Sequence, residues 1–213
     1  DAMDVMEEEA TEDIEKMAAI RPGDKPYLQT SVWETYKHRI PWLMLLMISA
    51  TFTSMIITRF EDALSVSIVL TGAIPMLMDT GGNCGGQASV TIIRALSLDD
   101  IEFKDIFRVI WKELRVGVIC GATLAIINFI KMWIQYMLIT HEGDILVIIT
   151  VSIALFAAVI VAKFIGCVLP ILAEKIGFDP AVMSSPFITT IVDALSLLIY
   201  MNLAVLIMKI PVT

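Results

Sequence analysis

The apolar residues of this chain are grouped into long blocks that short polar segments separate. A helix needs about 20 residues to cross the ~30 Å hydrocarbon core of a membrane, because it rises about 1.5 Å per residue. Five blocks reach or approach that length: 40–58, 63–98, 116–140, 145–173 and 180–208. The pattern therefore predicts an all-α membrane protein with five transmembrane helices.

The second block is interrupted by the polar run MDTGGNCGGQAS at residues 78–89. Pro75 and the glycine pairs predict a kinked or unwound helix, and such backbone is tolerated at membrane depth only against protein or water. Asp79, Asn83 and Gln87 follow at four-residue intervals and form one polar stripe. Counted from residue 63, Asp79 lies about 24 Å and Asn83 about 30 Å along the helix, level with residues 184–186. Close helix packing through the glycines is the alternative interpretation.

The fifth block carries a second polar stripe. Asp179 and Pro180 predict the start of a helix, with Asp179 as its cap. Asp193 follows about 21 Å further on, near the bilayer centre, and shares a face with Ser185 and Thr189. The structural alternative is that the hydroxyls bond backbone carbonyls and the acid pairs with a buried partner. Because an acid within a span is costly, we expect Asp193 to bind or conduct an ion in an aqueous path that both stripes face.

Composition agrees with a membrane protein, since 57% of the residues are hydrophobic and the mean hydropathy is +0.81. The net charge of −8 is mostly local, because residues 1–20 hold eight acids and one lysine. We predict an amphipathic connecting helix over 1–20, a linker and interfacial segment with a Ser31–Glu34 capping box over 21–34, and a membrane domain over 35–213. Because it opens on Asp, the chain is expected to be a fragment of a longer protein. The scattered cysteines indicate neither a disulfide framework nor a zinc site.

The basic residues predict how the chain crosses the membrane. A cytoplasmic N-terminus places most of them on the inner side and leaves Arg59, Lys131 and Lys209 on the outer side. Five spans then place the C-terminus outside the cell membrane. Lys131 and Lys163 are expected to snorkel toward opposite faces, so neither is expected to pair with Asp193.

Two stretches, PMLMDTGGNCGGQASVTIIRALSL and EKIGFDPAVMSSPFITTIVDALSLLIY, resemble the membrane domain of the MgtE family of magnesium channels. The resemblance covers roughly residues 35–210. It implies a homodimer in the lipid bilayer, with a pore on the two-fold axis that the second and fifth helices line. It also implies an acidic N domain and a CBS-domain pair upstream, joined by a plug helix that closes the pore at high cytoplasmic magnesium. Residues 1–20 resemble the end of that plug helix, so these regulatory domains are expected to be missing from this chain.

The resemblance also implies roles for residues of the fifth block. Asp193 matches the central pore aspartate that recognises magnesium. Thr189 and Ser185 match pore-facing positions one and two turns below it. The family often has Asn at position 185 and a smaller residue at position 189.

Other residues match family positions on the cytoplasmic side. Asn83 with Asp79, and Val182 with Ser185, match the region of the cytoplasmic constriction. Asp179 matches an acid that helps to bind regulatory magnesium. Our gating hypothesis is that magnesium bridges acids to hold the acidic helix at the inner mouth, and that repulsion releases it when magnesium falls.

The sequence therefore predicts magnesium transport through a channel-like pore, with Mg²⁺ as both the transported and a regulatory ion. Because Mg²⁺ dehydrates reluctantly, we expect Asp193 to recognise it through its water shell. A proton- or sodium-coupled secondary transporter is the alternative. An intramembrane aspartyl protease is a remote alternative, since it needs adjacent carboxylates and the counted depths separate Asp79 from Asp193. We expect neither an enzyme nor a nucleic-acid-binding protein.

Overall fold

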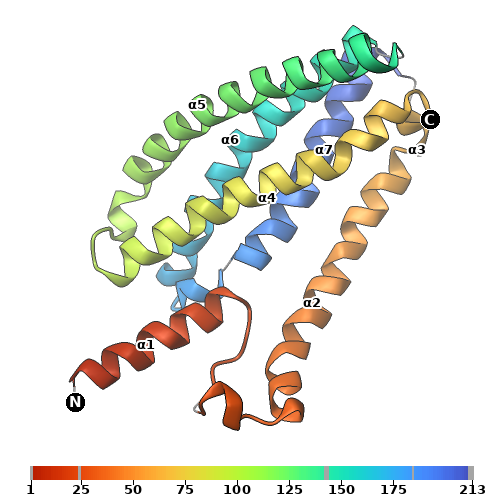
Figure 1. Ribbon diagram of the computed structural model, residues 1–213. Coiled ribbons are helices and arrows are strands. Elements are labelled where there is room, and N and C mark those ends of the chain that lie inside the picture. Colours follow the sequence, from red (N-terminus) through yellow and green to blue (C-terminus); the bar gives the residue numbers. More distant parts are fainter. Residues whose placement is uncertain (1, 24, 142–143, 184, 211–213) are drawn as a thin grey trace.

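The computed structural model describes residues 2–23, 25–141, 144–183 and 185–210, and this part of the chain is helical, with no strand (Figure 1). Its α-helices are α1 (Ala2–Met17), α2 (Val32–Arg59), α3 (Glu61–Ser65), α4 (Ile68–Ser97), α5 (Ile106–Met132), α6 (Ile145–Lys175) and α7 (Ser185–Met208). Shorter elements are the 3-10 turns η1 (Tyr27–Gln29), η2 (Phe103–Asp105) and η4 (Pro180–Val182), and the π-helical segment η3 (Trp133–Thr140) that extends α5.

The core of the molecule surrounds α6. This helix packs against α4, α5 and α7, and its residues Ile148, Val151 and Ala158 are completely buried. Tyr200 of α7 closes the core near the start of α4, where its hydroxyl donates a hydrogen bond of 2.8 Å to the carbonyl of Leu70. In contrast, α2 stands at the edge, contacts mainly α7 and buries none of its residues (Figure 1).

The long helices alternate in direction between the same two ends of the molecule (Figure 1). One end carries α1, the α4–α5 loop and η4, and the other carries α3 and the C-terminus. In the part of the chain that the structure describes, four helical stretches are long and apolar enough to cross a membrane: Val32–Arg59, Phe103–Tyr136, Ile145–Lys175 and Pro186–Met208. The 30-residue α4 runs alongside them, but its acid and amide side chains lower its hydropathy. The structure therefore supports a helical membrane protein with four apolar membrane-length helices.

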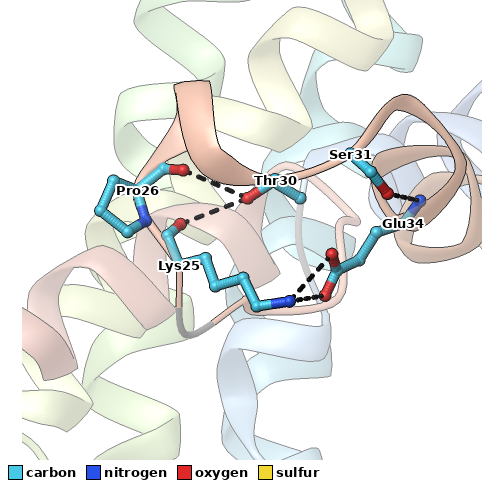
Figure 2. A network of polar contacts seen from close by, with 5 residues as sticks. All are labelled: Lys25, Pro26, Thr30, Ser31 and Glu34. Atoms are coloured by element: carbon cyan, nitrogen blue, oxygen red, sulfur yellow. Dashed lines mark hydrogen bonds and ion pairs between the residues drawn. The ribbon is translucent and has the colours of Figure 1, made fainter.

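The predicted first span and residues 32–34, the end of the predicted linker and interfacial segment, form one continuous helix, α2. The Ser31 side chain caps it by accepting a hydrogen bond of 3.2 Å from the Glu34 backbone N–H (Figure 2). The other half of the predicted capping box is replaced by an ion pair, in which Lys25 Nζ lies 2.9 Å from Glu34 Oε1. Thr30 Oγ donates to the carbonyls of Lys25 and Pro26 in the same turn (Figure 2). The linker is therefore folded against the start of α2.

The prediction of an unwound second span is wrong, because α4 stays helical from Ile68 to Ser97 through both glycine pairs. The glycines instead allow neighbouring helices to approach closely. A Cβ on Gly85 would lie 3.0 Å from Ile188 on α7 and 3.3 Å from the Ala162 carbonyl oxygen on α6. A Cβ on Gly166 of α6 would collide with the carbonyl oxygen of Gly85. The glycines therefore serve close helix packing, as the alternative interpretation held.

Two helix starts also differ from prediction. Ser67 caps α4 at Ile68, and residues 61–65 form the separate helix α3, so the second span begins five residues later than counted. Asp179 and Pro180 do form a cap and first turn, but of η4 and not of a long helix. The helix α7 starts only at Ser185, with Pro186 in its first turn, where a missing N–H costs nothing.

Candidate functional site

The candidate site lies where α4 and α7 pack side by side around Gly82. A Cβ at this position would lie 2.7 Å from Thr189 Cγ2 and 3.3 Å from Asp193 Oδ1. The absent side chain therefore lets both α7 residues rest against the backbone of α4. The two predicted polar stripes meet here through this contact.

Asp193 has a carboxylate that the described residues leave unsatisfied. Its Oδ1 atom is enclosed and has no hydrogen-bond partner in the described part of the chain. Asp79 is close enough for its charge to repel that of Asp193. An enclosed carboxylate oxygen without a donor, within reach of the charge of a second acid, is unfavourable by itself, and a cation beside it would relieve both costs.

The two stripes are aligned differently from the prediction. Ser89 Oγ donates a hydrogen bond of 2.8 Å to the Met183 carbonyl, while Gly82 lies beside Thr189 and Asp193. Residues 79–83 are therefore level with 189–196 and not with 184–186. The error comes from the helix start, since Asp79 is only about 16 Å along α4 when counted from residue 68. For the same reason Asp193 is about 12 Å along α7 and not about 21 Å from a helix start.

This alignment removes one argument of the sequence analysis. The counted depths separated Asp79 from Asp193 and so argued against a pair of catalytic acids, whereas in the structure the charge of Asp79 reaches Asp193.

The outward face of α4 is polar along its middle. Asp79, Asn83 and Gln87 are all exposed in this chain, as their four-residue spacing predicted. Thr189 on α7 is half-buried, and so is Val182 in η4, the turn that precedes α7. The side chain of Ser185, a predicted pore-facing residue, lies outside the described side chains.

Asp179 lies outside the bundle, at the junction between η4 and α1. Its Oδ1 accepts a hydrogen bond of 2.9 Å from the Ala181 N–H, and its Oδ2 lies 2.6 Å from Lys16 Nζ. Burial alone raises the Asp179 pKa, but these two donors outweigh it and leave the pKa below its ordinary value. Lys16 also pairs with Glu12 at 2.7 Å, and its pKa is raised by the hydrogen bonds to Asp179 and Glu12.

The described part of α1 contacts η4 through its charged residue Lys16, whereas Ile14 on its apolar side is 66% exposed. Burial, and next to it the charge of Asp179, raise the pKa of Asp13. The helix therefore docks through one ion pair within a cluster of acids. The side chains of residues 1–8 lie outside the described ones.

Two buried charges were missed by the sequence analysis. Glu113 of α5 and Lys163 of α6 are only 9% and 6% exposed. Lys163 was expected to snorkel, but a Cβ on Gly117 would lie 3.4 Å from Lys163 Cβ, so the lysine stem packs across this glycine of α5. A lysine in the middle of the most apolar block was the available signal.

These observations define a polytopic helical membrane protein with ionisable groups inside its bundle. The chain belongs to the MgtE family: the family model described as a divalent cation transporter matches residues 74–203. The predicted resemblance is therefore confirmed. A family of transporters also agrees with the expectation that the chain is not an enzyme.

Three curated relatives are similar over nearly the whole chain, and each is named magnesium transporter MgtE. The relative from Thermus thermophilus is 35% identical over 209 residues, which are 98% of this chain and 45% of the relative. The relative from Bacillus subtilis is 36% identical over 208 residues, or 96% of this chain and 44% of the relative. The relative from Enterococcus faecalis is 30% identical over 211 residues, or 98% and 44%. The chain thus spans a little under half the length of these relatives.

Proposed function

We propose that this chain is the membrane part of a magnesium transporter, with a channel-like pore lined by α4 and α7. The observation that carries the proposal is the enclosed, unpaired Oδ1 of Asp193, held against Gly82 beside a second acid. The identity of the ion as magnesium is inferred from the names of the relatives. In this proposal α4 is the second of five spans, and its lower hydropathy reflects its contact with the pore.

The polar face of α4 supports a pore between two copies of the chain. Asp79, Asn83 and Gln87 are exposed in one protomer, and such side chains within a span are tolerated only against protein or water. A two-fold axis along this face would bring two Asp193 residues toward one path. The proposed assembly is a homodimer with its pore on that axis.

Recognition of Mg²⁺ by Asp193 follows from the chemistry of the ion. Mg²⁺ keeps several waters and is usually held by one or two carboxylates. The Asp193 carboxylate accepts hydrogen bonds from the water shell, and Thr189 adds an oxygen one turn away. Conduction also requires weak binding, which a water-mediated contact provides.

Gating is proposed at the end that carries α1, which we assign to the cytoplasm, with the C-terminus outside. In this proposal Val182 and Ser185, before and at the start of α7, form the inner constriction. Asp79 and Asn83, for which the resemblance implied the same constriction, line the path near Asp193 instead, because residues 79–83 are level with the middle of α7. The acids of α1 lie beside Asp179, so Mg²⁺ at this junction would screen their repulsion and hold α1 in place. The regulatory domains of the full-length protein act through this helix.

Magnesium uptake into proteoliposomes tests the proposed class. We expect Mg²⁺ to enter down its own gradient at a rate that does not depend on a pH or sodium gradient. Uptake that requires either gradient would replace the channel with a coupled transporter, and liposomes without protein give the background rate. Failure of Mg²⁺ to enter under any gradient would contradict the proposed function.

A further inference from the structure

A polar cavity opens beside the polar face of α4, on the side of that helix that α5 and α6 cover. It has a volume of about 840 Å³ between α4, α5 and α6, and its lining includes Asn83, Gln87, Thr91, Glu113 and Lys163. Water occupies about 30 Å³ per molecule in the liquid, so a magnesium ion with six waters needs on the order of 200 Å³. The cavity has room for a hydrated ion and further water.

Two opposite charges are buried in the cavity wall without direct contact. No hydrogen bond or ion pair within 4.0 Å joins Glu113 to Lys163 in the described part of the chain, although both charges act on Cys167. Gly117 fixes the lysine stem against α5, one turn beyond Glu113. The Glu113 carboxylate opens onto the cavity, where a cation or water can compensate its charge, and Lys163 supplies only a distant charge here.

We propose that Glu113 is the anchor of a second site for a hydrated divalent cation. The carboxylate of Glu113, the amide oxygens of Asn83 and Gln87 and the hydroxyl of Thr91 are all hard oxygen acceptors of the kind that Mg²⁺ and its water shell prefer. Lys163 is the opposing charge that keeps the affinity of this site low. The inference rests on the proposed function for the identity of the ion.

The site is reachable from the end of the bundle that carries the α4–α5 loop. A neighbouring cavity of about 500 Å³ is also lined by Thr91 and Glu113, and it extends to Asp100 and Asp105 near that loop. On the other side, Asn83 and Gln87 belong to the exposed polar face of α4. Glu113 therefore stands between the loop end and the proposed pore, where a bound cation would be held before it enters the path.

An anion is the less favourable occupant. Lys163 would attract it, but Glu113 lies in the same wall and would repel it. Removal of the Lys163 charge distinguishes a cation from an anion as the occupant, because it affects their binding in opposite directions. A cation site gains affinity when the lysine charge is removed, whereas an anion site is lost.

Binding of Mn²⁺, a paramagnetic substitute for Mg²⁺, tests the site in the detergent-solubilised chain. Free Mn²⁺ is followed by electron paramagnetic resonance in an Asp193→Ala, Asp179→Asn background, which removes the proposed pore site and the proposed site at the α1 junction. We expect Glu113→Gln to weaken the remaining binding at least tenfold. We expect Lys163→Met, which keeps the stem that packs on Gly117, to strengthen it roughly tenfold.

The controls remove the same charges from exposed positions, with Glu174→Gln for the acid and Arg115→Gln for the base. Both should leave Mn²⁺ binding unchanged. Equal binding with and without Glu113, or weaker binding in Lys163→Met, would overturn the proposal. A misfolded protein would not bind Mn²⁺ more tightly, so the expected gain of affinity in Lys163→Met cannot come from misfolding. This variant therefore still tests the proposal if Glu113→Gln proves unstable. Because the readout is binding, this outcome is independent of whether Mg²⁺ is transported.

Discussion

The close packing of α6 on α4 predicts that one added methyl group will destabilise the protein. A Cβ on Gly166 would collide with the Gly85 carbonyl oxygen and lie 3.0 Å from Ala88 Cβ. The obstacle is backbone, so Gly166→Ala can be accommodated only by a shift between the two helices. Overpacking of this kind costs about 3 kcal/mol at the upper end, and the helix preference for Ala over Gly returns about 1 kcal/mol.

The net loss of about 2 kcal/mol corresponds to a fall in Tm of about 4–8 °C for a chain of this size. Gly72→Ala on α4 is the matched control, because no described side chain or neighbouring backbone lies within 4 Å of a Cβ at that position. This variant should gain about 1 kcal/mol and melt about 2–4 °C higher than the wild type. The assay is the fraction of monodisperse protein in detergent after heating. If Gly166→Ala is as stable as Gly72→Ala, the glycines do not set the helix spacing and the packing argument fails.

Three further predictions follow from individual contacts. Asp179→Asn should speed amide hydrogen exchange in α1 at neutral pH. Since the Asp179 pKa is lowered and that of Lys16 is raised, the wild type should lose this protection only when the pH falls below the ordinary aspartate pKa of 3.8. Equal exchange in both proteins at neutral pH would contradict the ion pair. Gly82→Ala should slow Mg²⁺ uptake severalfold, because its Cβ would lie 2.7 Å from Thr189 Cγ2. Thr189→Ser in the same chain removes that methyl group and should restore uptake. If the double variant stays slow, the steric explanation is refuted. Tyr200→Phe should cost about 1 kcal/mol of stability and lower Tm by about 2–4 °C, because the Leu70 carbonyl loses the hydrogen bond from the Tyr200 hydroxyl. An unchanged Tm would show that this hydrogen bond adds nothing to stability.

The arrangement of helices along the chain was predictable, because the length of an apolar block and the periodicity of its residues can be read from the local sequence. The apolar helices, the Ser31 cap and the exposed stripe of Asp79, Asn83 and Gln87 follow directly from them. The role of the glycines was not predictable in this way. A glycine pair favours both a helix break and close helix contact, and only the partner, such as Gly166 on α6, decides between them.

The alignment of the two stripes depends on a single capping residue. Ser67 starts α4 at Ile68, and this shift of five residues moves Asp79 from the level of residues 184–186 to that of Asp193. Burial of Lys163 was equally hidden in the sequence, since a long side chain snorkels unless a neighbour such as Gly117 gives its stem a place to pack. The dimer, the orientation and the gate stay predictions.

The most direct test of the central claim is Mg²⁺ uptake into proteoliposomes by Asp193→Asn, which keeps the side-chain shape and removes its charge. Glu61→Gln, an exposed acid at the start of α3, is the control for the loss of one carboxylate. We predict at least a tenfold loss of uptake in Asp193→Asn, with unchanged elution in detergent, and uptake equal to the wild type in the control. Undiminished uptake in Asp193→Asn would contradict the account and move ion recognition to another group, with Asp79 the nearest acid.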